Sequence, residues 1–206
     1  MLISFEGVEG AGKTTQMRLL AERLEAEHGL HNVLLTREPG DGPLGQELRR
    51  LVLHPPSDVP VDARAELFIM LADRAQHVGL VIGPHLAADG VVLCDRYADS
   101  SVAYQGYGRG LDIAHIQSLN VFATQGLVPH LTVLLDIDPA LGLARQHERS
   151  RMERETLPFH ERVRAGFLSL AQSEPERFAV INAARPVDAV HADIWGVVAS
   201  RLFSRS

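Results

Sequence analysis

Residues 7–14 read GVEGAGKT and match every position of the Walker A pattern, a glycine-rich loop that cradles phosphate groups. The short apolar run before this loop, Leu2–Glu6, predicts a buried strand. After the loop, spaced apolar residues predict a helix from Thr14 to His28. Because the pattern requires a strand before the loop and a helix after it, we predict that the chain binds a nucleotide here.

The loop supplies three kinds of phosphate contact. Its glycines let backbone N–H groups turn inward, and the N-terminus of the following helix favours an anion. Lys13 is the only lysine among 20 basic residues, and its compact charge suits the β- and γ-phosphates of ATP better than a guanidinium group. The Thr14 hydroxyl is a candidate ligand of Mg²⁺. The other loop residues predicted to bind ATP are Gly7, Gly10, Ala11, Gly12 and Thr15.

Glu9 is unusual in such a loop, because a carboxylate repels phosphate. We expect its side chain to avoid the phosphates of the bound nucleotide. It would face either solvent or a neutral donor such as a sugar hydroxyl.

Strand and helix patterns alternate along the rest of the chain. Further strands are predicted over Val33–Thr36, Val91–Cys94, Leu131–Ile137 and Phe178–Asn182. Helices are predicted over Leu44–Leu53, Val61–Ala88 (interrupted near Gly83-Pro84), Ile113–Gln125, Pro139–Glu148, Phe159–Ala171 and Asp188–Phe203. Strands without hairpin turns need crossover helices and form a parallel sheet. We therefore predict an α/β fold of P-loop NTPase type in one domain over residues 1–206, with a five-stranded parallel sheet flanked by helices in three layers.

Composition excludes several other classes. Hydrophobic residues make up 46% of the chain and charged residues 22%, which suits a globular core rather than a disordered tail. A net charge of −6 argues against a nucleic-acid partner. No apolar run approaches the ~18–20 residues of a membrane span, and the amino end lacks the pattern of a signal peptide. With Cys94 as the single cysteine, we expect a cytoplasmic protein.

Polar residues follow two of the predicted strands, where ligands bind in open parallel sheets. Asp95 fits a carboxylate that acts on Mg²⁺ directly or through water, and Arg96 fits a phosphate clamp. A purely structural ion pair between the two is the alternative. The segment Thr36–Gly40 occupies another strand end and contains a possible cis bond before Pro39.

Two further segments have the composition of mobile or ligand-contacting parts. Ser100–Gly110 is expected to be a glycine-rich polar loop, either in contact with a ligand or a flexible connector. Residues 145–158 carry several arginines and little apolar content. They form either a solvated helix face or a lid that closes over a transferring phosphate. The 10 histidines show neither cysteine partners nor HExxH spacing, so we assign no protein-built metal site.

Several P-loop classes compete at this point. A switch-type GTPase needs a base-reading Asn-Lys-x-Asp motif, which a chain whose only lysine is Lys13 lacks. ATP-driven machine subunits are usually longer. A nucleotide-dependent binding module with a degenerate site conflicts with intact Lys13, Thr14, Asp95 and Arg96. A phosphotransferase is favoured, because candidates for an acceptor site and a lid are both present.

The combined motifs Glu6–Thr15, Thr36–Gly40, Asp95–Tyr97 and Ala103–Gly106 resemble those of bacterial thymidylate kinases, and the resemblance runs nearly end to end. It implies transfer of the γ-phosphoryl group of ATP to dTMP with Mg²⁺, giving ADP and dTDP, and usually a homodimer. Another small-acceptor P-loop nucleoside monophosphate kinase is the alternative. Because a nucleotide phosphate is already ionised near neutral pH, the reaction needs alignment and charge neutralisation rather than a strong base.

The resemblance also implies residue roles. Toward dTMP it places Glu9 at the 3′-hydroxyl, Arg96, Arg49 and Arg37 near the phosphate, Arg74 against the thymine, Ser101 and Gln105 near its polar edge, and Tyr104 under the deoxyribose. Lys13, Arg96 and a lid arginine carry catalysis. Arg149 and Arg151 are the lid candidates, and Arg145 lies nearer the adenine.

Two positions depart from the family pattern. Met70 stands where the family usually has a phenylalanine that stacks on the thymine, and Phe68 is rotated about 200° away on a helix. We expect weaker dTMP binding or looser base selectivity as a result. Ser150 precedes Arg151 where the lid often has an aspartate, which leaves open which lid arginine is catalytic.

Overall fold

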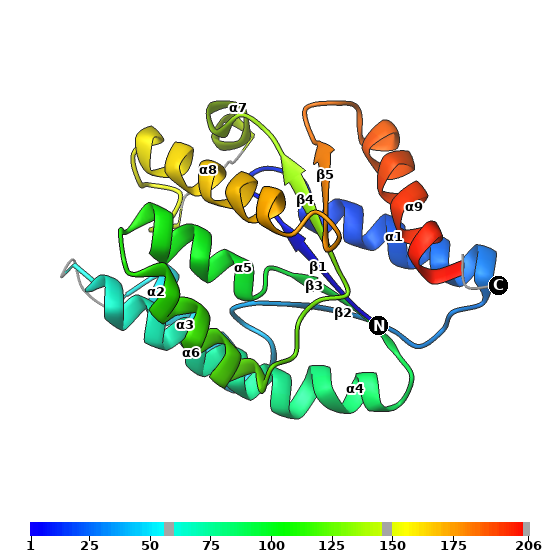
Figure 1. Cartoon of the computed structure of the whole chain (residues 1–206), viewed down its shortest axis with the longest axis horizontal. Helices are drawn as coiled ribbons and strands as arrows, with labels where there is room; N and C mark the ends of the chain where they lie inside the picture. The colour runs from blue at the N-terminus through cyan, green and yellow to red at the C-terminus, as the bar shows by residue number, and fades with distance from the viewer. Residues whose placement is uncertain (56–59, 146–149, 204–206) are drawn as a thin grey trace.

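A parallel five-stranded sheet forms the centre of the protein (Figure 1). The computed structural model describes residues 1–55, 60–145 and 150–203. The strands run in the order β2-β3-β1-β4-β5, and every neighbouring pair is parallel. Their bounds are β1 (Leu2–Glu6), β2 (Val33–Arg37), β3 (Val91–Asp95), β4 (Leu131–Asp136) and β5 (Phe178–Asn182). The fold class and all five predicted strands are confirmed.

Helices cover both faces of the sheet. Their bounds are α1 (Lys13–His28), α2 (Gly42–Leu53), α3 (Ala63–His77), α4 (Gly83–Ala87), α5 (Ala98–Ser101), α6 (Ile113–Thr124), α7 (Pro139–Ala144), α8 (Leu157–Ser173) and α9 (Val187–Phe203), with π-helical turns η1 (Val78–Ile82) and η2 (Val102–Gly108). In Figure 1, α1 and α9 lie side by side, apart from α3, α6 and α8. None of the helices in the described ranges is both long and apolar enough to cross a membrane.

The central strands are buried on both sides, as their continuous apolar sequences predict. Successive side chains of a strand point to opposite faces. Thus Leu93 of β3 packs in one cluster with Leu20 of α1, whereas Val92 packs in another with Ile82 of η1. This double cover holds the strand ends rigid, which positions the loops that follow them.

The predicted helical stretch Val61–Ala88 is present as α3, η1 and α4 in direct succession. The predicted interruption near Gly83-Pro84 appears as a widened turn, in which the backbone N–H of Gly83 donates to the carbonyl of Val78. Pro84 has no N–H to donate, so the regular ladder is broken at this point.

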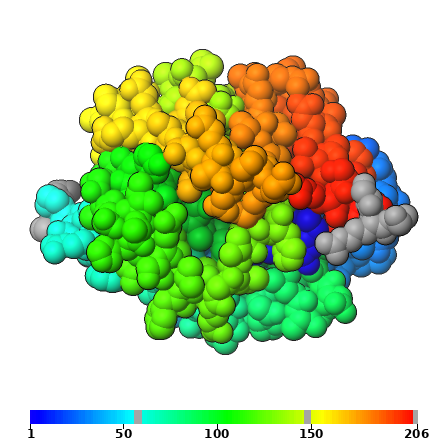
Figure 2. All heavy atoms as spheres, in the orientation of Figure 1, coloured from blue at the N-terminus to red at the C-terminus, as the bar shows by residue number. Residues whose placement is uncertain are grey.

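The prediction of a polar loop over Ser100–Gly110 is wrong, because α5 and η2 occupy most of it. Gly106 and Gly108 mislead the sequence pattern, because they allow close packing of a helical segment rather than a flexible loop. A Cβ on Gly108 would lie 2.7 Å from the Phe159 ring of α8. Figure 2 shows the atoms of α8 directly against the green atoms of this region. Thus η2 packs against α8 in the region for which the sequence left a flexible connector as the alternative.

Candidate active site

The glycine-rich loop curls around the amino group of Lys13. Gly7, Gly10 and Gly12 all have positive φ angles, of 139°, 71° and 90°, which favour glycine. The Lys13 Nζ donates to the carbonyls of Gly7 and Val8, each at 3.2 Å, and the residue is 7% exposed. The loop therefore presents backbone N–H groups and one ammonium group at the N-terminus of α1, an arrangement that binds anions.

Close packing of two backbone segments also explains why residue 10 is a glycine. A Cβ there would lie 2.0 Å from the carbonyl oxygen of Gly142 in α7. Arg145, just after α7, donates from NH1 to the carbonyls of Gly10 at 3.3 Å and Ala183 at 3.4 Å. The helix that precedes residues 146–149 thus rests on the glycine-rich loop.

Thr14 and Asp95 meet at the end of the central strands. The Thr14 hydroxyl donates to the Asp95 carboxylate at 2.9 Å. Asp95 arrives there because it ends β3, in register with Phe5 of the neighbouring β1. A hydroxyl and a carboxylate oxygen are donors that suit Mg²⁺, so the pair fits the metal role that the sequence predicts.

Two cavities adjoin this loop. The first, which we name the phosphate cavity, has a volume of about 890 Å³ and is lined by Glu9, Gly10, Gly12, Lys13, Thr14, Thr15, Arg37, Glu38, Arg49, Asp95, Arg96 and Arg145. Its five cations come from five different segments of the chain. Of the loop residues predicted to bind ATP, Gly7 and Ala11 lie outside this lining, and Gly7 contributes its carbonyl to Lys13.

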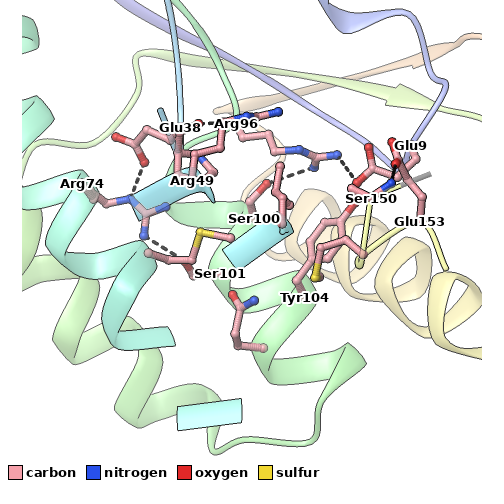
Figure 3. A pocket seen from close by; sticks show the side chains of 15 residues that line it. Glu9, Glu38, Arg49, Arg74, Arg96, Ser100, Ser101, Tyr104, Ser150 and Glu153 are labelled. Atoms are coloured by element: carbon pink, nitrogen blue, oxygen red, sulfur yellow. Dashed lines mark hydrogen bonds and ion pairs between the residues drawn. The ribbon is translucent and has the colours of Figure 1, made fainter. Parts of the chain in front are cut away.

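The second cavity, which we name the acceptor cavity, has a volume of about 600 Å³ (Figure 3). It is lined by Glu9, Glu38, Pro39, Arg49, Leu53, Met70, Arg74, Arg96, Ser100, Ser101, Tyr104, Gln105, Ser150, Met152 and Glu153. Every residue predicted to bind the acceptor lies here, except Arg37, which lines the phosphate cavity. The two cavities share Glu9, Glu38, Arg49 and Arg96, so they meet at these side chains.

Arg96 occupies the junction of the cavities. Its guanidinium donates to the Glu9 carboxylate at 2.8 Å and to the Gly7 carbonyl at 3.0 Å, and it lies 4.9 Å from the centre of the Tyr104 ring. Its φ angle of 70° is rare for a side chain other than glycine. Such backbone strain persists where surrounding contacts hold it, and here those contacts aim the guanidinium between the cavities.

Glu9 lines both cavities, and its charge is compensated. Its carboxylate accepts from Arg96 and from the Tyr104 hydroxyl at 2.9 Å. Burial alone would raise the pKa of Glu9, but the charges of Arg96 and Lys13 and the Tyr104 hydrogen bond lower that pKa to about 2. The Glu9 carboxylate is therefore ionised and can only accept hydrogen bonds. An ionised carboxylate is what the predicted contact with a sugar hydroxyl requires.

The far end of the acceptor cavity is formed around Arg74, which is 2% exposed. Its guanidinium donates to Glu38 at 2.7 Å, to Ser101 at 2.8 Å and to Asn120 at 2.7 Å, as Figure 3 shows for the first two. The Glu38 carboxylate also forms a hydrogen bond with Nδ1 of His77 at 3.0 Å. These partners hold Arg74 in one orientation beside Met70. Phe68 is 58% exposed and lies outside the cavity, which confirms that it points elsewhere.

The three predicted lid arginines have different placements. Arg145 lines the phosphate cavity, and Arg149 lies outside the described residues. Arg151 lines neither cavity, because its guanidinium donates to the Glu66 carboxylate at 2.5 Å and to the Val52 carbonyl at 2.8 Å. The structure therefore brings only Arg145 to the phosphate cavity among those it describes.

Sequence reasoning missed several residues that line the acceptor cavity or lie behind its wall. Glu38 is the carboxylate that pairs with Arg74, although its segment stood out in the sequence only as a strand end with a possible cis bond before Pro39. Glu66 is fully buried on α3 and shares a helix face with Met70 and Arg74, four and eight residues further on. That spacing places the Glu66 charge on the same helix face as two residues of the cavity wall, and it is a signal that the sequence contains. The other missed residues come from the predicted lid, and their residue types do not identify them as part of a binding site: Ser150, Met152 and Glu153.

Comparisons with known proteins agree with this geometry. The model of the family described as thymidylate kinase matches residues 5–194. A thymidylate kinase of Solidesulfovibrio magneticus is 55% identical, covering 98% of this chain and 100% of the relative. One of Deinococcus radiodurans is 50% identical, covering 98% and 97%. The crystal structure of thymidylate kinase from Ehrlichia chaffeensis superposes with a TM-score of 0.81 at 35% identity, covering 96% of this chain and 98% of that one.

Proposed function

The chain belongs to the thymidylate kinase family and transfers the γ-phosphoryl group of ATP to dTMP; we propose that the phosphate cavity holds ATP and the acceptor cavity holds dTMP. The observation that carries this assignment is the position of Arg96. Its guanidinium lies where the two cavities meet, which is where a donor and an acceptor phosphate must come together.

The transfer itself is an exchange of one bond for another. A phosphate oxygen of dTMP forms a bond to the γ-phosphorus, while the bond from that phosphorus to the bridging oxygen breaks and ADP leaves. No proton has to be removed from an already ionised phosphate. Catalysis thus depends on alignment and on charge neutralisation by Lys13 and Arg96, with Arg37 and Arg49 as further cations.

Glu9 and Tyr104 would position the sugar of dTMP. The Glu9 carboxylate is ionised, so it accepts a hydrogen bond from the 3′-hydroxyl without competing for the phosphate. The Tyr104 hydroxyl, which donates to Glu9, holds that carboxylate in place. Arg74, Ser101, Gln105 and Met70 are left to surround the base.

Thr14 and Asp95 are the residues that we propose hold Mg²⁺, the carboxylate either directly or through water. When bound, Mg²⁺ neutralises charge on the ATP phosphates. A lid arginine would complete the positive surroundings. Arg149 and Arg151 are the candidates, and Arg151 would have to leave Glu66 to reach the phosphates.

We also propose a homodimer through the surface formed by α3, η1 and α6. Phe68, Leu80, Val121 and Phe122 are 58%, 67%, 60% and 85% exposed on these elements, which pack against one another. A group of large exposed apolar side chains marks an interaction surface. Phe122→Asp is expected to convert a dimer to a monomer in light scattering, whereas Leu141→Asp on α7, also exposed, leaves the dimer intact.

We place the protein in the cytoplasm and expect no nucleic-acid partner. The Cys94 thiol is free and buried, which suits a reducing compartment. The net charge of −6 repels a polyanion.

A coupled assay of ADP release tests the assignment of the acceptor cavity. ATP and Mg²⁺ are supplied with dTMP, dUMP, dCMP, AMP, GMP or shikimate. We expect turnover with dTMP well above that with the other acceptors. Turnover only with another acceptor would overturn the assignment of the thymine pocket, and nucleotide binding without turnover would indicate a binding module.

A further inference from the structure

Glu66 lies behind the part of the acceptor cavity wall that Gln105 forms, and it contacts two other segments of the chain. It belongs to the first turns of α3 and is 0% exposed. Its Oε1 accepts from Nε2 of Gln105 in η2 at 2.8 Å. Its Oε2 accepts from NH2 of Arg151 at 2.5 Å. One buried carboxylate thus joins a residue that lines the cavity to the segment 150–155.

Arg109 strengthens the same junction. It donates to both Glu66 oxygens, at 3.3 and 3.2 Å, and pairs with Glu155 at 2.7 Å. It also lies 3.7 Å from the sulfur of Met152, which lines the acceptor cavity. Arg109 therefore links Met152, a residue of the cavity wall, to Glu66.

Charge at this junction is balanced. The guanidinium groups of Arg109 and Arg151, 17% and 21% exposed, face the carboxylates of Glu66 and Glu155. Burial raises the pKa of Glu66, but the Gln105 hydrogen bond and the two arginines lower it overall, so the carboxylate is charged. A neutral residue at position 66 would leave two guanidinium groups with one carboxylate. Mutual repulsion would then release the segment 150–155 from α3.

The same carboxylate determines how the Gln105 carboxamide is turned. An ionised carboxylate only accepts hydrogen bonds, so the NH₂ group of Gln105 must face Glu66. The carboxamide oxygen is then the group left for other partners, and Gln105 lines the acceptor cavity. A ligand in that cavity would meet an acceptor oxygen rather than a donor, which suits a base that presents an N–H.

We propose that Glu66 is a positioning residue that couples recognition of the pyrimidine base to the placement of the segment 150–155 against α3. It orients Gln105 toward the base and, through Arg109 and Arg151, holds Met152 in the cavity wall. This inference rests on the proposed occupation of the acceptor cavity by dTMP. Activity of the wild-type enzyme with dTMP is measured first, so a failure of that proposal is recognised separately.

Glu66→Gln is the central variant, because it keeps the shape and removes the charge. A neutral amide forms weaker hydrogen bonds with Gln105, Arg109 and Arg151 than the Glu66 carboxylate does. We therefore expect the KM for dTMP to rise about tenfold or more. The KM for ATP and the kcat at saturating dTMP should change by less than about threefold, since Glu66 touches neither Lys13 nor Arg96. A general loss of structure would instead alter both KM values and the kcat together.

Asp136→Asn is the matched control. Asp136 forms a two-bond ion pair with Arg164, at 2.7 and 2.8 Å, and lines neither cavity. We expect a lower Tm without a selective change in the KM for dTMP. An equal rise of the dTMP KM in both variants would overturn the proposal, as would an unchanged dTMP KM in folded Glu66→Gln.

Arg151→Gln tests the connection to the segment 150–155, and it stays informative if Glu66→Gln does not fold, because Arg151 is partly exposed. Alone, it should raise the dTMP KM less than Glu66→Gln does, since Gln105 and Arg109 remain bound. The dTMP KM of the double variant should match that of Glu66→Gln alone, because both changes break one junction. A fall in kcat confined to the variants that lack Arg151 would report its separate role as a lid arginine. Multiplied effects would mean that the two residues act independently and would contradict the coupling.

Discussion

Arg96 and Glu9 form an ion pair of 2.8 Å, although 87 positions separate them in the chain. Their side chains are 16% and 19% exposed, and they stand at the junction of the phosphate and acceptor cavities. The pair explains how a glycine-rich phosphate loop tolerates a carboxylate. Arg96 compensates the charge of Glu9, and its guanidinium still lines both cavities, where an anion would bind.

Replacing Arg96 by Gln is expected to lower kcat/KM for dTMP by about 30- to 3,000-fold, the cost of truncating one partner of a buried charge pair. The variant loses the clamp and leaves Glu9 as an uncompensated negative charge beside the dTMP phosphate. Steady-state kinetics measure the effect. Glu9→Gln added to Arg96→Gln should recover part of the loss if this repulsion contributes. Arg18→Gln, an exposed control, should behave as wild type.

Thr14 offers a test of the Mg²⁺ site. Thr14→Val keeps the side-chain shape but removes the hydroxyl that contacts Asp95. We expect the Mg²⁺ concentration for half-maximal activity to rise about 10- to 100-fold, as for other altered metal sites. Thr14→Ser keeps the hydroxyl and should stay near wild type. Equal responses of the Val and Ser variants would exclude the hydroxyl as the group that matters.

Glu6 predicts a pH-dependent stability. Burial, helped by the charge of Asp99, raises the pKa of Glu6 from 4.5 to about 7, although Arg96 and hydrogen bonds from Ser100 and Tyr97 oppose the rise. Between these pH values the folded state keeps a proton that the unfolded state releases. The free energy of unfolding should therefore fall as the pH rises through this window, by up to about 3 kcal/mol.

Glu6→Gln removes this titration, because an amide is neutral at every pH in the window. Urea unfolding at pH 5 and pH 8 compares the two proteins. The variant should gain stability relative to wild type as the pH rises. The same stability difference at both pH values would show that Glu6 does not hold a proton in the folded protein.

Met70→Phe is expected to lower the KM for dTMP about fivefold, since an aromatic ring stacks on a base more strongly than a thioether does. Met70 lines the acceptor cavity together with Met152. The KM for dUMP should fall as well, because stacking acts on either pyrimidine ring, whereas the KM for ATP should not change. An unaltered dTMP KM would show that Met70 does not face the base.

Most of the architecture follows from local patterns. Buried parallel strands have continuous apolar sequences, so β1 and β3 could be predicted within a residue of their bounds. The failure at Ser100–Gly110 has a specific cause. Gly106 and Gly108 have the composition of a loop, but their lack of side chains lets Phe159 and Ile113 approach a helical segment. Only a contact between distant segments reveals this use of glycine.

The lid illustrates a second limit of sequence reasoning. Arg145 and Arg151 look alike in the sequence, as cations of one charged segment. In the structure Arg145 lines the phosphate cavity, and Arg151 lies against Glu66 of α3, 85 positions earlier. Which carboxylate an arginine meets depends on how the helices pack.

The sequence by itself determined the sheet, the phosphate loop and the chemical types of the site, because strand burial, glycine conformation and side-chain charge are local properties. Tertiary structure alone decided the partners. It brought Glu9 to Arg96, Thr14 to Asp95 and Glu66 to Gln105, Arg109 and Arg151. Such pairings join strand ends and helices that are far apart in the chain. They follow from the order of the strands and the packing of α3 and α8 around them, which no single stretch of residues encodes.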